Sequence, residues 1–159
     1  MDQKKLSLWL KAVVIGIALS GLVVYLIAVP SAGASLRASY PEFAYCYWPW
    51  LIFLWLTAVP LYMGLLSGYR IAGNIGRDRS FCVDNALLFA RVARLAAVDT
   101  AFFFVGNVVY LFLGLSHPGI LLMSLMVCFF GVAITVAAAC LSHLVRKAAD
   151  LQEQSDLTI

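Results

Sequence analysis

The sequence predicts an all-α integral membrane protein, with residues 1–159 forming one domain folded as an antiparallel bundle of four transmembrane helices. Hydrophobic residues make up 64% of the chain and charged residues only 12%, whereas soluble domains average roughly half apolar and a quarter charged. A chain this short leaves much of its surface facing solvent, so a mean hydropathy of +0.95 indicates that the solvent is lipid. Four apolar runs each reach about the 20 residues that a spanning helix needs.

The first predicted span covers residues 8–29, with Lys4 and Lys5 before it and Lys11 near its start. A secretory signal is the alternative, because residues 32–34 read Ala-Gly-Ala and have the A-x-A form of a cleavage site. The apolar run is longer than a typical signal core. We therefore expect a retained helix.

Residues 30–47 are predicted to form a loop of small and aromatic residues. Aromatic rings crowd its second half and the start of the next span, at Tyr40, Phe43, Tyr45, Tyr47, Trp48 and Trp50. Such rings prefer the headgroup level of a bilayer. An interfacial belt is therefore expected, with an aromatic ligand patch as the alternative.

The second predicted span, residues 48–66, contains Pro60, which removes one helical hydrogen bond and predicts a kink. We interpret this proline as a packing feature, with a functional kink as the alternative. The third span is expected over residues 95–115 and the fourth over residues 120–144. Residues 116–119 then form a tight turn, and residues 145–159 a polar tail.

Residues 69–94, between the second and third spans, are predicted to form the main extramembrane loop. Gly73, Asn74 and Gly76 are expected to break the second helix, and helical character resumes at Val83. The loop carries four arginines beyond these breaks: Arg77, Arg79, Arg91 and Arg94. Arg91 and Arg94 share a helix face by their spacing and can reach lipid phosphates.

The positive charges predict the orientation. One side of the predicted topology collects ten of them: Lys4, Lys5, Lys11, Arg70, Arg77, Arg79, Arg91, Arg94, Arg146 and Lys147. Arg37 stands alone on the other side. Cytoplasmic flanks collect lysine and arginine, so both termini and the 69–94 loop are expected in the cytoplasm of a multi-pass inner-membrane protein.

Three stretches carry a resemblance to a known family. They are Pro60 in the second span, the run Phe81-Cys82-Val83-Asp84-Asn85, and a tail in which an Ala-rich turn and an acidic stretch lead to Leu157-Thr158-Ile159. In these stretches the chain resembles a bacterial family of small four-helix membrane proteins known as domain of unknown function 2975. The family usually has Ser where this chain has Cys82. That difference removes an expected helix cap and leaves Ser80 or Asp84 as substitutes.

The resemblance implies a partner, because members of this family are commonly encoded beside a small helix-turn-helix regulator. It therefore implies a membrane-bound protein that binds such a regulator and makes no direct contact with nucleic acid. The candidate partner-binding residues are Arg77, Arg79, Phe81, Asp84, Asn85, Arg91, Arg94, Asp156, Leu157, Thr158 and Ile159.

Asp99 is the most informative single residue within the spans, since an ionisable group at membrane depth is costly and often functional. Lys11 and His143 are expected at a similar depth on other helices, and Asn107 lies close to the Asp99 face. These four residues form a predicted intramembrane polar cluster. A structural Asp99–Lys11 pair is the favoured interpretation, and a proton-responsive or ligand site is the alternative.

Gly131, Thr135 and Ala139 recur every four residues in the fourth span, with Ala138 and Ser142 adjacent. Small residues at this spacing allow close packing of membrane helices. We expect them to form a seam within the chain, with a homo-oligomer face as the alternative.

Sequence motifs for catalysis are lacking: the chain has no nucleophile elbow, P-loop, HExxH or paired carboxylates. Cys140 and His143 alone are too few to hold a metal. The sequence therefore predicts a protein that is not an enzyme and has no metal or cofactor.

Two hypotheses for function follow. The first is a membrane-bound partner that sequesters a cytoplasmic helix-turn-helix regulator. The second is a protein that responds to a small molecule, a proton or a peptide, in an immunity or transport role, centred on Asp99.

Overall fold

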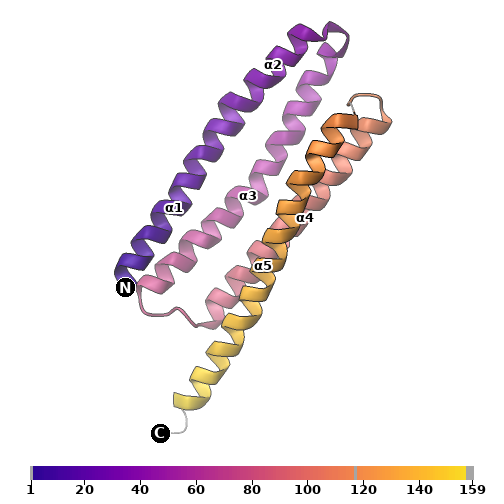
Figure 1. Cartoon of the computed structure of the whole chain (residues 1–159). Coiled ribbons are helices and arrows are strands. Elements are labelled where there is room, and N and C mark those ends of the chain that lie inside the picture. The colour runs from indigo at the N-terminus through magenta and orange to yellow at the C-terminus, as the bar shows by residue number, and fades with distance from the viewer. Residues whose placement is uncertain (1, 117, 157–159) are drawn as a thin grey trace.

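The computed structural model describes residues 2–116 and 118–156, and these form helices joined by short connections (Figure 1). The main helices are α1 (Gln3–Val23), α2 (Val29–Ser39), α3 (Tyr47–Gly76), α4 (Val83–Phe112) and α5 (Pro118–Asp156). A π-helical turn, Val24–Ala28, joins α1 to α2, and a 3-10 turn, Pro41–Cys46, leads into α3. Four helical segments are long and apolar enough to cross a membrane, which confirms the predicted fold class.

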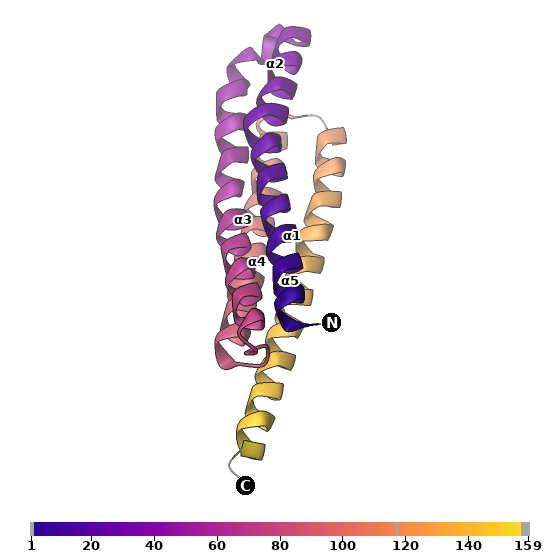
Figure 2. The ribbon, with the colours of Figure 1, turned by 90° about the vertical axis from the view of Figure 1, so that its left-hand side faces the viewer.

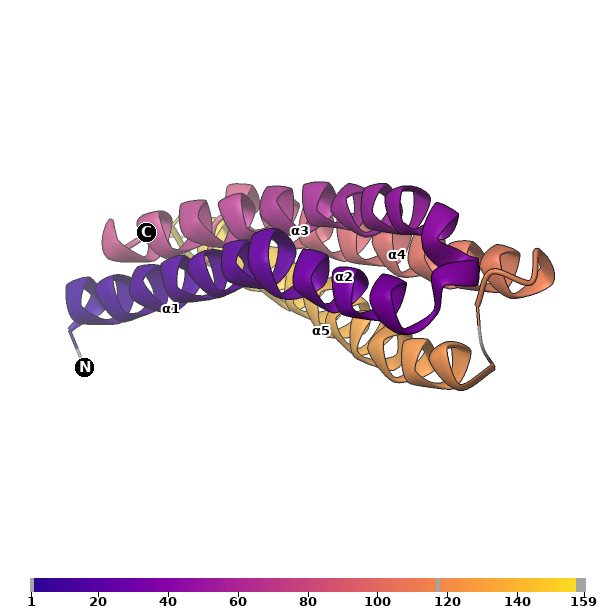
Figure 3. The same cartoon turned by 90° about the horizontal axis from the view of Figure 1, so that it is seen from above.

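The helices pack in the order α1, α3, α4, α5, each antiparallel to the next (Figures 1 and 3). Among the described residues α1 packs on α3 but not on α4 or α5, and α5 packs on α4 alone. The start of α1, the α3–α4 connection and the far end of α5 lie at one end of the molecule (Figures 1 and 2). We call it the basic end. The helices thus form an open row without a shared central core.

The first helix continues where the sequence analysis placed a loop at residues 30–47. Pro30 has no N–H to donate, and the π-helical turn before it changes the bonding so that Val29 donates to the Val24 carbonyl. The next carbonyl in that pattern belongs to Tyr25, and the Trp55 ring N–H donates to it at 2.9 Å. Such a bond satisfies a carbonyl that proline leaves free, so the helix runs through Pro30 to Ser39.

The expected loop at residues 69–94 shortens to residues 77–82. Gly73, Asn74 and Gly76 do not break α3, because these residues lie at contacts between α3 and the neighbouring helices. A Cβ on Gly76 would lie 2.6 Å from the Ser7 hydroxyl, so the glycine permits close approach of α1. The helix ends where Asp78 takes a left-handed conformation (φ 60) and Arg79 N–H bonds back to the Asn74 carbonyl.

The expected polar tail at residues 145–159 is helical through Asp156, and Leu157–Ile159 lie outside the described residues. The helix persists because Val145 and Ala149 are buried against the rest of the molecule. As a result α5 extends past the other helices at the basic end (Figures 1 and 2).

Candidate functional site

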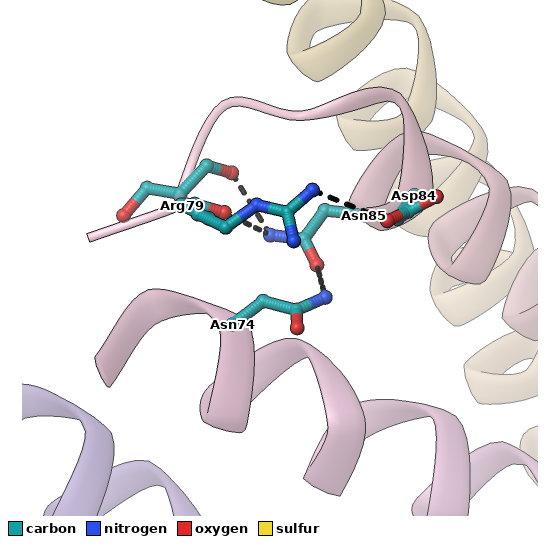
Figure 4. A network of polar contacts seen from close by, with 5 residues as sticks. Asn74, Arg79, Asp84 and Asn85 are labelled. Carbon is teal, nitrogen blue, oxygen red and sulfur yellow. Dashed lines mark hydrogen bonds and ion pairs between the residues drawn. The ribbon is translucent and has the colours of Figure 1, made fainter. Parts of the chain in front are cut away.

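The short α3–α4 connection is held in place by a pair of asparagine side chains (Figure 4). Asn85 is 1% exposed, and its amide nitrogen donates to the carbonyls of Arg79 and Ser80. Its side-chain oxygen accepts a 2.8 Å bond from the Asn74 amide. The first residue before α4, Cys82, offers no side-chain cap, and the Asn85 bonds fix the approach to α4 instead. Neither Ser80 nor Asp84 takes the cap, since Ser80 bonds Gln3 and Asp84 pairs with Arg79.

A groove of about 1030 Å³ lies beside this connection, between α3 and α4 and bordered by α1. Five cations line it, and we call it the basic groove: Lys11, Arg70, Arg77, Arg91 and Arg94. Asp84 is the one acidic residue in its lining, and its carboxylate lies 3.6 Å from the Arg79 guanidinium. Both of those side chains are more than half exposed, so that ion pair is weak.

The charge of the basic groove is not neutralised by neighbouring carboxylates. Among the side chains that the structure describes, those of residues 2–116 and 119–155, the only ion pair is the one between Arg79 and Asp84. The Lys11 ammonium instead lies 5.3 Å from the centre of the Tyr69 ring, a cation–π contact. The groove can therefore receive an anion without first breaking an ion pair of its own arginines.

A second groove, of about 570 Å³, lies between the α3–α4 connection and the far part of α5. We call it the loop–tail surface; its lining is Gln3, Asp78, Arg79, Ser80, Phe81, Cys82, Val83, Ala149, Gln152 and Glu153. Phe81 is 58% exposed there. An exposed aromatic ring rimmed by polar groups is a common feature of protein-binding surfaces.

The structure divides the predicted partner-binding residues between these two grooves. Arg77, Asp84, Arg91 and Arg94 line the basic groove, whereas Arg79 and Phe81 line the loop–tail surface. Asn85 is buried and holds the connection. Asp156 ends α5, and Leu157, Thr158 and Ile159 lie outside the described residues.

The predicted polar cluster of Lys11, Asp99, Asn107 and His143 is not assembled in the structure. Lys11 lies over Tyr69, and His143 is exposed on α5. Asn107 is buried and bonds the Phe103 carbonyl of its own helix. The physical reason is the open row: α1 does not pack on α4, so Lys11 makes no ion pair with Asp99.

Asp99 instead faces α3. It shares a helix face with Phe103, Gly106 and Tyr110, and this face packs on the Phe53 ring. Gly106 lies against Phe53, and seven residues along each antiparallel helix bring Asp99 level with Pro60. One carboxylate oxygen of Asp99 is buried and has no hydrogen-bond partner among the described residues.

The α4–α5 seam consists mostly of small residues, spaced by seven on α4 and alternately by four and three on α5. On α4 the seam residues are Ala86, Ala93, Thr100 and Asn107; on α5 they are Ser124, Cys128, Gly131, Thr135, Ala138, Ser142, Val145 and Ala149. The Thr100 side chain fills the space beside Gly131, and Ser142 donates to the Ala86 carbonyl at 2.7 Å. Ala139 is exposed and lies outside this seam. The seam residues of α5 are spaced alternately by four and three, and this spacing places Ala138 in the seam, where it is buried.

Sequence reasoning missed the contacts that attach α1 to α3. Ser7 donates to the Ala72 carbonyl at 2.6 Å, and Tyr62 donates to the Ala18 carbonyl at 2.8 Å. Just after α1, in the π-helical turn, the Tyr25 hydroxyl lies 3.0 Å from the Thr57 hydroxyl of α3. These contacts depend on which helices pack together, and the sequence alone does not show which helix lies beside the first one.

Metal ligands do not gather in the described part of the chain, where no three His, Cys, Asp or Glu side chains come together. Cys140 is exposed, and Cys46 and Cys128 are buried in separate places.

Comparison with known proteins identifies the family. The chain is 28% identical over 149 residues to the uncharacterized membrane protein YoaS of Bacillus subtilis (strain 168), with 92% of each chain covered. No solved structure matches it. A family model described as "Protein of unknown function (DUF2975)" matches residues 31–159. The chain is therefore a membrane protein that belongs to the DUF2975 family of unknown function.

Proposed function

We propose that this protein is a membrane-bound partner of a cytoplasmic helix-turn-helix regulator. The regulator would bind at the loop–tail surface. The basic end faces the cytoplasm in this proposal. Its support is the asymmetry of charge, since the lysines and arginines gather at the basic end and Arg37 is at the end of α2.

The observation that carries the proposal is that two segments distant in sequence line the same groove. The α3–α4 connection and the far part of α5 line one groove, with Phe81 exposed within it. The far part of α5 extends beyond the other helices (Figure 2), and its residues Ala149, Gln152 and Glu153 line this groove. A partner in the cytoplasm therefore reaches both segments at once, with Phe81 as the apolar anchor.

The regulator class comes from the family resemblance. A small helix-turn-helix protein must reach DNA to act, so retention at the membrane would lower its free concentration. Binding at the loop–tail surface would thus control transcription without contact between this protein and DNA.

Site-specific photo-crosslinking in intact membranes tests the proposal. A photoreactive amino acid at Phe81 is expected to capture a helix-turn-helix protein. Phe112 is the matched control, because it is the same residue type, is 87% exposed and lies at the opposite end of α4. Equal capture at both positions, or capture of no helix-turn-helix protein at Phe81, would contradict the proposal.

A second candidate function rests on Asp99. Its buried oxygen has no partner among the described residues, and an unpaired ionisable group within a span suggests a role in sensing or transport. In this alternative the protein responds to a proton, a small molecule or a peptide at the α3–α4 seam. Suppose that a stably folded Asp99→Asn variant no longer responds to the proton, small molecule or peptide. That result would favour this alternative over regulator binding.

A further inference from the structure

We propose that the basic groove binds the phosphate headgroup of an anionic phospholipid, with an acyl chain along the apolar inner part of the groove. This inference does not depend on the partner at the loop–tail surface. It rests on the charge of the groove, its level in the membrane and the arrangement of its lining.

The level follows from where the apolar spans end. Arg70 and Arg94 lie where the apolar runs of α3 and α4 meet polar segments, and Lys11 lies three residues inside the start of the first predicted span, on α1. The structure brings all three to the lining of one groove. The three spans therefore end at a common level, which is the headgroup level of the bilayer leaflet at the basic end.

The lining changes from polar to apolar along the helices. At the outer part, near the α3–α4 connection, Arg77 and Asp84 lie beside Leu87 and Leu88, whereas the lining toward the spans is apolar, with Met63, Leu95 and Val98. Asp84 and Val98 are fourteen residues apart on one helix, so the groove extends for about 20 Å. A phospholipid has the same polarity profile, with its phosphate at the interface and its chains within the hydrocarbon.

The cations suit a phosphate in particular. Arginine presents a planar fork of donors that matches two phosphate oxygens, and four of the five groove cations are arginines: Arg70, Arg77, Arg91 and Arg94. None of these has a carboxylate partner within the described residues. Their donors are therefore available to a ligand. Free phosphate compounds share this chemistry but have no chain to cover the apolar wall.

Native mass spectrometry of the full chain tests the proposal, after extraction in mild detergent with an equal mixture of phosphatidylglycerol and phosphatidylcholine. The native chain is expected to retain phosphatidylglycerol preferentially. A double variant, Arg91→Gln with Arg94→Gln, should reduce that preference about 25-fold, since each cation near the surface contributes about fivefold. Both side chains are exposed, so their replacement leaves the packing of α3 and α4 unchanged.

The matched control is Arg146→Gln with Lys147→Gln. It removes the same charge near the same end of the molecule, and neither residue lines the groove. It should retain the preference of the native chain. Equal retention of both lipids by the native chain, or an unchanged preference in the Arg91/Arg94 variant, would overturn the proposal.

Glycerol 3-phosphate separates the two sources of phosphate. If the groove binds a lipid, this soluble compound at equal concentration should not displace phosphatidylglycerol, because it leaves the apolar wall uncovered. Full displacement would assign the groove to a soluble phosphate ligand and overturn the lipid assignment.

Discussion

At the scale of single residues, Asp99 stands out because it is an ionisable side chain in an apolar span. It lies level with Pro60 in the α3–α4 seam, and one of its oxygens is buried without a partner. A buried polar atom without a hydrogen bond lowers stability, commonly by about 1–3 kcal/mol. Such a cost in a membrane span suggests that the residue is retained for a purpose other than stability.

We therefore expect Asp99→Leu to raise the thermal unfolding temperature of the protein in detergent. The free energy of unfolding should increase by about 1 kcal/mol or more, because the unpaired oxygen is removed. Asp150→Leu is the control, since Asp150 is exposed on α5 and should change stability little. A clear loss of stability in Asp99→Leu would instead show that Asp99 has a stabilising partner.

The surroundings of Asp99 also show which features of a single residue the sequence can predict and which it cannot. Ionisable residues within spans are conspicuous, so Asp99 could be singled out from the sequence alone. Its neighbours could not, because the choice between α1, α3 and α5 depends on helix packing. Lys11 and His143 are predicted at a depth similar to that of Asp99, yet in the open row Lys11 lies over Tyr69 and His143 is exposed.

At the scale of helices, small residues and side-chain hydrogen bonds determine which elements pack together. Water does not drive apolar helices together inside a bilayer, so close approach and hydrogen bonds become decisive. Gly131 admits the Thr100 side chain, and Gly76 admits Ser7. Seam residues at seven-residue spacing continue from the span into the far part of α5 and explain why that part remains helical.

Gly131→Ala tests this account of the α4–α5 seam. The new methyl group would overlap the Thr100 side chain, and overpacking of this kind typically costs about 1–3 kcal/mol. The measurement is thermal unfolding in detergent, with Gly64→Ala as the control, because no atom lies within 4 Å of a Cβ at that position.

Gly64→Ala should be neutral or stabilising, since alanine is the better helix former. Addition of Thr100→Ala should recover part of the stability that Gly131→Ala loses. If Gly131→Ala and Gly64→Ala behaved alike, the seam would not depend on close contact at Gly131.

Helix ends were harder to predict from the sequence than helix existence. The apolar runs located all four spans, because each spanning helix needs a long apolar stretch. Pro30 and the Gly73–Gly76 stretch resembled stop signals, but Trp55 and Ser7 supply contacts that let the helices continue. Those contacts join segments distant in sequence, so local residue preferences could not predict them.

At the scale of the whole molecule, the open row separates a long apolar surface from a charged end. The hydropathy of the spans and the family relationship agree that the protein lies in a membrane. The two grooves lie at the same end, one between α3 and α4 and the other between the connection and α5. This arrangement allows one end of the protein to contact both the lipid headgroups and a partner.

The proposed function rests on one central claim: the basic end faces the cytoplasm. The most direct test is thiol labelling with a membrane-impermeant maleimide, on chains whose four native cysteines are replaced by alanine. Single cysteines at Ser80 and Gln152 report on the basic end, and Ser116 reports on the α4–α5 connection.

We predict that Ser116→Cys is labelled in intact cells, whereas Ser80→Cys and Gln152→Cys are labelled only after the membrane is permeabilised. Labelling of Ser80→Cys or Gln152→Cys in intact cells, with Ser116→Cys protected, would place the basic end outside and contradict the account.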